Sequence, residues 1–473
     1  MAYLEGENRY QSTFIPRSLD EQIDDDNPVR VIDAYVDSVD LVELGFNHYL
    51  GTKAGQKPYR RQDILKIILY CYMNKIRSSR MIEQETKRNI ELMWLTSGLS
   101  PDHGTIAGFI KDNKSAIKAL FKDYVLMLKG LALIEGKLIA IDGTKIRASN
   151  AKNKHFNHNK IKIKLEYYEN RIKEYLDEIE KTDEDISPKV KEKFEKYTER
   201  INRLKEIQTE LKDEKKKQIC LTDPDAKSMR NNGCFEPCYN VQTAVDEKNK
   251  IIIAYDVVND GNDQAQLKNM VDRAKEVMND CEDNEEARIF ILDTGYYNRQ
   301  QIVEVTDDKT EILIKKRAKA SDKIGDYDKV KFDYNSETNS FICPDGYEVI
   351  YKHKDKSHEH PVYKYKCIGF DACKNREKCT KSKTGREITV STFDNELKDI
   401  EKNTLEKNHI YKKRGCIVEH PFGTIKRHFG YDHFLRRGFD SVQSEMGLIL
   451  LAYNLKRAIK VLGVKEMMSL LRA

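Results

Sequence analysis

The segment Leu138-Ile-Ala-Ile-Asp142-Gly-Thr-Lys145 decides the fold class, because a short apolar run ends on a carboxylate and a glycine. Runs of about four to eight apolar residues bounded by turn residues indicate strands buried in a sheet. A second run, Arg288-Ile-Phe-Ile-Leu-Asp293-Thr-Gly-Tyr296, has the same design. Each segment therefore predicts a strand that carries an aspartate at its tip.

The surrounding segments extend these two strands into an α/β sheet. The stretches 239–246 and 250–258 predict a β-hairpin, and residues 311–314 predict one more strand. Helices are expected at 263–278 and 299–305, between these strands. The resulting order of β, long insertion, ββ, α, β, α, β predicts a mixed α/β sheet.

Helical segments precede and interrupt this core. Residues 1–130 have apolar positions at helical spacing, and Thr105 in Ser100-Pro-Asp-His-Gly-Thr105 is a candidate helix cap, as in helix-turn-helix proteins. An ordinary helical corner explains the same residues. Residues 159–217 combine Lys and Glu with apolar residues three and four apart, which predicts a helical hairpin. Its charge fits a solvated face, with a dimer contact or a DNA-touching arm as alternatives.

Five regions follow from these patterns. They are a helical N-terminal region (1–130), a sheet core (131–158 and 218–320), a helical hairpin insertion (159–217), a Cys-rich basic insertion (321–398) and C-terminal helices that complete the core (399–473).

A third carboxylate lies in a basic stretch, Tyr411-Lys-Lys-Arg414-Gly-Cys-Ile-Val-Glu419-His-Pro-Phe-Gly-Thr-Ile-Lys426-Arg427, where Glu419 is expected to begin a helix. Phosphodiester cleavage uses paired Mg²⁺ ions roughly 3.5–4 Å apart, which Asp and Glu oxygens hold. Asp142, Asp293 and Glu419 are therefore predicted to bind catalytic Mg²⁺ or Mn²⁺. Lys145 and Arg147 follow Asp142 closely enough to reach phosphates.

Other aspartates compete for this role. Asp246 precedes Glu247-Lys-Asn-Lys250 and is interpreted as a hairpin turn residue. Asp263 precedes a predicted helix and is interpreted as its cap. Asp256 and Asp260 cluster with Asp263 after the third strand. None of these four aspartates is favoured over the three chosen acids.

Composition narrows the class of protein. The chain has 473 residues, 39% of them hydrophobic, which is enough for two to four domains. Its net charge is only +5, so affinity for nucleic acid must come from local basic patches. No apolar stretch approaches the roughly 20 residues that cross a bilayer, and no export signal is evident, so a cytoplasmic protein without a membrane partner is expected.

Four cysteines in the 321–398 insertion form a candidate metal site. Cys343, Cys367, Cys373 and Cys379 are separated by 23, 5 and 5 residues, and four thiolates can hold a structural Zn²⁺. The alternative is a small β-rich module with reduced thiols. Nearby histidines are weaker candidates for ligands; they are His353, His358 and His360.

The chain resembles the DDE transposases of bacterial insertion sequences. The resemblance runs over nearly the whole chain, through Pro101-Asp-His-Gly-Thr-Ile, Ile141-Asp142-Gly-Thr-Lys145, Tyr239-Asn-Val-Gln, Asp293-Thr-Gly-Tyr296 and the segment 411–427. That last segment is similar to the family pattern Tyr-x2-Arg-x3-Glu-x6-Lys, but four residues rather than three separate Arg414 from Glu419.

The resemblance implies a fold, a reaction and partners. The fold is the RNase H-like fold of retroviral integrases, and Asp142, Asp293 and Glu419 bind the catalytic metals. The reaction is hydrolytic nicking at the element's ends, followed by transfer of the 3′-hydroxyl into target DNA. Lys426, Arg427, Arg414 and Tyr411 are the implied contacts to double-stranded DNA. A homodimer in the DNA complex and a nucleoid-associated place in a bacterial cytoplasm are further expectations.

Two other functions fit the same residues. One is an RNase H-like endonuclease that cuts without strand transfer. The other is a non-catalytic DNA-binding regulator that retains the fold, although such a protein does not require the three acids.

Overall fold

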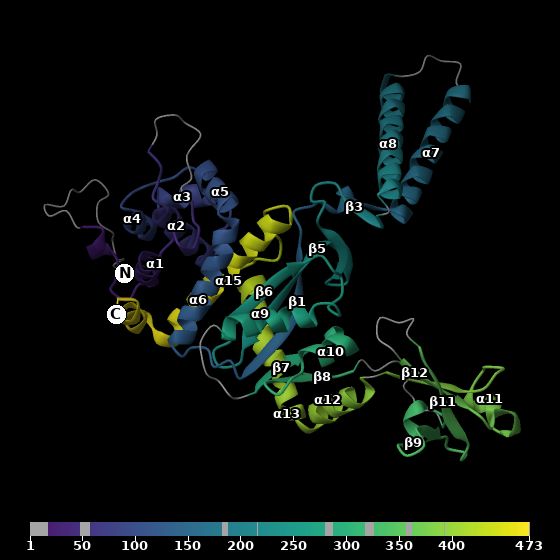
Figure 1. Ribbon diagram of the computed structural model, residues 1–473. Helices are drawn as coiled ribbons and strands as arrows, with labels where there is room; N and C mark the ends of the chain where they lie inside the picture. The colour runs from purple at the N-terminus through teal and green to yellow at the C-terminus, as the bar shows by residue number, and fades with distance from the viewer. Residues whose placement is uncertain are drawn as a thin grey trace, which may run out of the picture. The chain divides into compact units, whose positions relative to one another are not determined.

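The computed structural model describes residues 18–47, 57–181, 188–214, 216–279, 287–316, 326–355, 362–391 and 393–472 (Figure 1). The chain divides into two compact units. The first unit comprises Met1–Glu135, Gly143–Gly261 and Ile417–Ala473, and the second comprises Gly136–Asp142 and Asn262–Cys416. Strand β1 and helix α14 each contribute residues to both units.

The N-terminal part of the first unit is helical, as the apolar spacing predicts. Its helices are α1 (Pro28–Ser38), α2 (Arg61–Met73), α3 (Ser79–Thr86), α4 (Ile90–Thr96), α5 (His103–Asp112) and α6 (Lys114–Gly130). From the C-terminal end come α15 (Phe439–Leu462) and α16 (Val464–Arg472). Helix α15 packs against α2 and α6. It is buried around much of its circumference, which is the pattern expected of a helix that is apolar on nearly all sides.

The cap of helix α5 differs from the sequence prediction. The helix begins at His103, and the side chain of Asp102 accepts a hydrogen bond from the Thr105 amide at 2.6 Å. Thr105 thus lies in the first turn and is not the cap. A carboxylate at the cap position satisfies an amide that has no partner inside the helix, so Asp102 fills the role assigned to Thr105.

The central sheet is mixed, as predicted. Its strands are β1 (Leu138–Arg147), β4 (Lys227–Asn231), β5 (Cys234–Asp246), β6 (Ile252–Val258), β7 (Arg288–Leu292) and β8 (Thr310–Ile314). They follow the order β4-β5-β1-β7-β8, with β6 paired to β5. Strands β1, β7 and β8 are parallel, whereas β4, β5 and β6 are antiparallel. The β5–β6 pair is the predicted hairpin, and the Lys248 amide donates to Asp246 in its turn.

Two amphipathic helices, α7 (His158–Lys181) and α8 (Pro188–Asp213), occupy the segment predicted as a helical hairpin. They contact each other, with Tyr168 and Tyr175 of α7 against Tyr197 of α8, and Figure 1 shows them closest at the base of the element. The short strands β2 (His155–Asn157) and β3 (Gln218–Cys220) pair at the base of this element. Its apolar cluster lies near that base; the buried residues are Phe156, Ile161, Leu204, Ile207, Leu211 and Ile219.

Helices α9 (Leu267–Asn279), α10 (Arg299–Val305) and α12 (Asp394–Glu406) belong to the second unit. Helix α12 packs on β8, where the hydroxyl of Thr404 accepts from the Ile314 amide at 3.3 Å. Helix α9 begins four residues later than predicted, so Asp263 is not its cap. Asp263 lies instead in the loop before the helix, where its carbonyl accepts from the Gln266 amide.

Residues 326–391, here called the cysteine module, form a separate small sheet within the second unit. Its strands are β9 (Asp333–Asn335), β10 (Ser340–Ile342), β11 (Glu348–Asp355), β12 (Val362–Cys367) and β13 (Glu387–Ser391), in the antiparallel order β13-β12-β11-β10-β9. The short helix α11 (Arg376–Cys379) precedes β13. The core of the module has five buried residues: Phe332, Phe341, Val349, Tyr365 and Ile388.

The C-terminal helix that carries Glu419 is longer than the sequence suggests. Helix α14 spans Lys413–Gly423 and is followed by a π-helical turn, Thr424–His428. Glu419 therefore lies in mid-helix, and the prediction that it begins the helix is wrong. Proline favours the first turn of a helix, but Pro421 is accommodated inside α14, directly before the irregular turn. No helix in the described ranges is both long and apolar enough to span a bilayer.

Candidate catalytic site

Asp142 and Asp293 lie side by side because of the register between β1 and β7. The two strands are parallel, and Ile141 pairs with Leu292. The next residue in each segment is an aspartate. Asp293 directly follows β7, as predicted, but β1 continues through Asp142 to Arg147, so the prediction that Asp142 lies at the tip of its strand is wrong. Neighbouring strands are about 4.8 Å apart, so this register brings the carboxylates into the same region. The residues before them are fully buried: Ile139, Ala140, Ile141, Phe290, Ile291 and Leu292. The buried strand residues therefore fix the backbone of Asp142 and Asp293. We call these two residues the acid pair.

The guanidinium of Arg414 bridges the acid pair. Its Nη1 donates to Asp142 Oδ2 at 2.8 Å, and its Nη2 lies 3.7 Å from Asp293 Oδ1. The side chain of Asp293 is 46% exposed, whereas those of Asp142 and Arg414 are 24% and 23% exposed. Both carboxylates therefore face one cation at a partly open position. Ion pairs with this much solvent access are weak, so another cation can compete with Arg414.

Aromatic side chains surround this position within the second unit. Tyr296 is buried, and its burial raises the pKa of the phenol well above its usual value, with Asp263, Asp142 and Asp293 adding to the effect. Burial also raises the pKa of Tyr411, and the Lys315 ammonium lies 4.7 Å from the centre of the Tyr411 ring. Tyr411 therefore lies within electrostatic reach of the acid pair, which its position in the sequence does not reveal.

Asp263 is the acid that sequence reasoning assigned to another role. Its Oδ2 is only 3.5 Å from the position that a Cβ on Gly295 would occupy. Gly295 follows Asp293 by two residues, so Asp263 lies beside the loop that carries the second member of the acid pair. The sequence offers one signal for this placement, a short Gly-Asn-Asp segment at 261–263 before the helix.

Glu419 belongs to the first unit. Its neighbours Ile417 and Val418 are buried, while Glu419 itself is exposed. The next residue, His420, is hydrogen-bonded through Nδ1 to the Tyr453 hydroxyl at 2.9 Å. These contacts anchor α14 and leave the Glu419 carboxylate available to a ligand.

Three of the basic residues predicted to bind DNA lie close to one another in the first unit. Lys426 Nζ donates to the backbone carbonyl of Lys145 at 2.7 Å, and burial lowers the pKa of Lys426. Arg147 pairs with Asp432 at 2.6 Å, with both side chains roughly half exposed. Arg427 is exposed on the π-helical turn. Lys145, Arg147 and Lys426 therefore form a neighbourhood around the end of β1.

The acid pair fits a divalent cation, although no ready-made site is present. Among the residues that the structure describes, no three His, Cys, Asp or Glu side chains are arranged as a metal-binding group. Asp142 and Asp293 nevertheless both contact a single positive group, and carboxylate oxygens are the hard donors that Mg²⁺ and Mn²⁺ prefer. The two carboxylates thus offer the kind of donor atom that the predicted metal prefers, and both face the same position.

Comparisons with known proteins give two family matches. The model of a family described as "Transposase DDE domain" matches residues 135–455, and one described as "Transposase domain (DUF772)" matches residues 17–112. A comparison with curated proteins found no match. A cryo-EM structure of a piggyBac transposase synaptic complex with hairpin DNA aligns over 94% of this chain and 79% of its own, at 8% identity and a TM-score of 0.33. That similarity is too low to support an argument.

Proposed function

Because the chain belongs to the DDE transposase family, we propose that it nicks DNA at the ends of an insertion sequence and joins the freed ends to target DNA. Family membership agrees with the resemblance drawn from the motifs. In the proposed first step, water attacks a phosphorus atom and the P–O3′ bond breaks, leaving a 3′-hydroxyl and a 5′-phosphate. In the second step, that hydroxyl attacks a target phosphodiester and displaces a 3′-oxygen.

Asp142 and Asp293 are the proposed ligands of the catalytic metal. The observation that carries this assignment is their shared contact with Arg414, which shows that both carboxylates face one cation. A bound divalent ion would make a nucleophilic oxygen available at neutral pH and stabilise charge on the attacking and leaving oxygens. The two carboxylates would hold the ion in a fixed position, because the strand residues before them are buried in the sheet.

Glu419 is the proposed third acid, as its place in the family's Glu-x6-Lys pattern implies. Its mid-helix position, with buried residues on the preceding turn, gives the carboxylate a rigid support. Arg414 leads the same helix, so this helix would carry both an acid and the cation that now pairs with the other acids.

The basic residues are proposed contacts to the phosphate backbone. Lys145, Arg147, Lys426 and Arg427 would bind phosphates near the cut strand, with Tyr411 and Arg414 contributing from the second unit. Each phosphate neutralised by such a side chain releases counterions, so affinity should fall as salt rises. Joining two element ends to one target also calls for at least two copies of the chain, and we propose a homodimer in the DNA complex.

A nicking and joining assay tests the proposal. Duplexes with the element's terminal sequences, taken from the DNA that flanks the coding region, are incubated with protein and Mg²⁺. The D142N, D293N and E419Q variants should neither nick nor join, whereas D308N, which changes an exposed aspartate of the second unit, should act like the parent. If the three variants cut as well as the parent, the assignment fails. Cutting without joined products would favour the endonuclease.

A further inference from the structure

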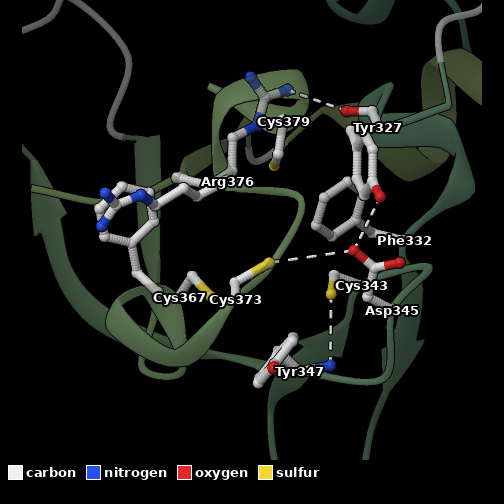
Figure 2. A pocket seen from close by; sticks show the side chains of 11 residues that line it. Tyr327, Phe332, Cys343, Asp345, Tyr347, Cys367, Cys373, Arg376 and Cys379 are labelled. Atoms are coloured by element: carbon white, nitrogen blue, oxygen red, sulfur yellow. Dashed lines mark hydrogen bonds between the residues drawn. The ribbon is translucent and has the colours of Figure 1, made fainter. Parts of the chain in front are cut away.

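Four thiols from separate places in the cysteine module line one small cavity (Figure 2). Cys343 follows β10, Cys367 ends β12, Cys373 follows the 3₁₀ turn Phe370–Ala372, and Cys379 ends α11. We call these four residues the cysteine cluster. The cavity has a volume of about 20 Å³, which is room for a single water-sized or ion-sized occupant. Besides the four cysteines, both apolar and charged side chains line it, among them Phe332, Asp345 and Arg386.

The backbone around Cys343 wraps its sulfur. The Tyr347 amide donates to Cys343 Sγ at 3.2 Å, while the Gly346 amide donates to the Cys343 carbonyl at 2.8 Å. Gly346 has a φ of +81°, a conformation that favours glycine, and this lets the chain turn back on the sulfur. Amide donors aimed at a sulfur stabilise its negatively charged form, because a thiolate can only accept hydrogen bonds.

A second cysteine has a similar backbone donor. The Gly369 amide donates a hydrogen bond to the Cys367 sulfur. Cys379 lies within electrostatic reach of Arg386 and of the other three cysteines. All four sulfurs are therefore within electrostatic reach of one another.

A partly exposed arginine lines the same cavity. Arg386 Nη2 donates to the Tyr327 carbonyl at 3.5 Å, while its Nε is shielded from solvent and has no hydrogen-bond partner among the described residues. A shielded guanidinium nitrogen without a partner is costly unless negative charge lies nearby. The Asp345 carboxylate, 3.9 Å from Cys373 Sγ, also lines the cavity, and thiolates would add further negative charge. Arg376 lies at the rim, where it adds positive charge.

The module has a small apolar core for its size. Among its described residues, five buried apolar side chains form the core, with four partly buried ones packed against them, and strand β11 is mostly exposed. Small folds of this kind usually depend on disulfides or a metal in addition to their core. The four cysteines are free thiols in the structure.

From these observations we propose that Cys343, Cys367, Cys373 and Cys379 bind one structural Zn²⁺ as thiolates. Four sulfur ligands in tetrahedral arrangement are the usual donor set of structural zinc, with Zn–S distances of about 2.3 Å. The described thiols are not yet arranged as a finished metal site, so binding requires rotation of the side chains toward the cavity centre. Arg376 and Arg386 would offset the negative charge of a zinc ion with four thiolates.

The histidines of this segment are not needed as ligands. His353 lies exposed on β11, opposite Lys364, and is not among the residues that line the cavity. His358 and His360 fall outside the described residues. The cysteine cluster therefore supplies a complete set of four donors by itself.

Metal analysis of the full-length protein tests this proposal. Protein purified without chelators should contain one zinc per chain by mass spectrometry of the metal content. The double variant C373S/C379S should lose that zinc, while C234S, which changes an exposed cysteine of the first unit, and D142N/D293N should keep it. Equal zinc in the parent and in C373S/C379S would overturn the proposal. So would iron as the bound metal, or zinc lost from D142N/D293N alone.

A second measurement covers the case in which the double variant misfolds. Treating the parent with a chelator should make four additional thiols reactive toward a thiol reagent, and restoring Zn²⁺ should protect them again. The C379H variant keeps a zinc ligand and should retain the metal, unlike C379S. Unchanged thiol reactivity after chelation, or equal loss of zinc from C379H and C379S, would contradict the proposal.

Discussion

The acid pair and the cysteine cluster are two candidate metal sites in the second unit, and they are held in place differently. Asp142 lies within β1 and Asp293 directly follows β7, and the residues before each of them are fully buried in the central sheet. The cysteine cluster lies between short strands, loops and a four-residue helix around a core of five side chains. The first site should be positioned by the protein alone, whereas the second should depend on its metal.

This difference separates two uses of a metal. Where a large apolar core fixes the ligand backbone, the metal serves chemistry and its loss leaves the fold intact. Where the core is small, the free energy of metal binding becomes folding free energy, and metal loss unfolds the module.

Neutralising the acid pair should abolish activity without changing stability. We expect D142N or D293N to lower the nicking rate by at least about a thousandfold, because metal stabilisation of the transition state contributes several kcal/mol. The unfolding midpoint should match that of D308N, since both aspartates are partly exposed and the strands below them are unaltered. Nicking assays and thermal unfolding check the two halves. A large loss of stability would show that the acids are structural.

Chelation should destabilise the cysteine module and leave the central sheet, which carries the acid pair, unchanged. Removing zinc should expose the amides of β11 and β12 to hydrogen exchange, while those of β1 and β7 stay protected. Hydrogen exchange with mass spectrometry on the full-length chain measures both sets in one sample. If exchange in β11 and β12 is unaffected by the chelator, the cysteine module does not depend on a metal.

Removing the competing guanidinium should strengthen metal binding at the acid pair. Arg414 contacts both aspartates, so R414Q removes a cation that competes for their oxygens. Partly exposed ion pairs contribute about 0.2–1 kcal/mol, which corresponds to an affinity for Mn²⁺ increased by roughly 1.4- to 5-fold. Titration followed by the electron paramagnetic resonance of free Mn²⁺ provides the measurement, with R299Q as the matched control. Weaker Mn²⁺ binding by R414Q would mean that Arg414 supports the metal site.

The smallest effect concerns pH. Burial lowers the pKa of Lys426, so its ammonium is lost at lower pH than that of an ordinary lysine. Charging the buried amine costs stability below the folded-state pKa, and this cost disappears as pH rises toward the unfolded-state value. DNA affinity should therefore begin to fall at moderately alkaline pH, and K426R should remove this dependence because arginine stays charged. Fluorescence anisotropy with labelled duplex DNA across pH compares the two proteins.

The central sheet could be predicted from the sequence because its strands are short apolar runs that end in turn residues. The same runs predicted both aspartates at strand tips, which holds for Asp293 but not for Asp142, because β1 continues to Arg147. The register of β1 and β7 nevertheless makes the two aspartates neighbours. The capping assignments were less accurate. A cap is decided by which residue's backbone leaves the helix, so Asp102 took the position given to Thr105. Asp263 likewise belongs to a loop rather than to a helix end.

Two features of the sites could not be read from the sequence. The position of Glu419 within α14 depends on how the chain accommodates Pro421 and then widens into a π-helical turn, and local propensity does not encode this. The convergence of four cysteines depends on the pairing of five short strands, which the 23-, 5- and 5-residue spacings leave open. Long-range strand pairing decided the second of these two features.

Anomalous diffraction from crystals grown with Mn²⁺ would show whether Asp142 and Asp293 bind the catalytic metal. We expect a manganese peak bonded to carboxylate oxygens of both residues, with the Arg414 guanidinium moved away from them. Manganese bound elsewhere in crystals of a protein that nicks DNA, with Arg414 still bridging the two aspartates, would contradict it.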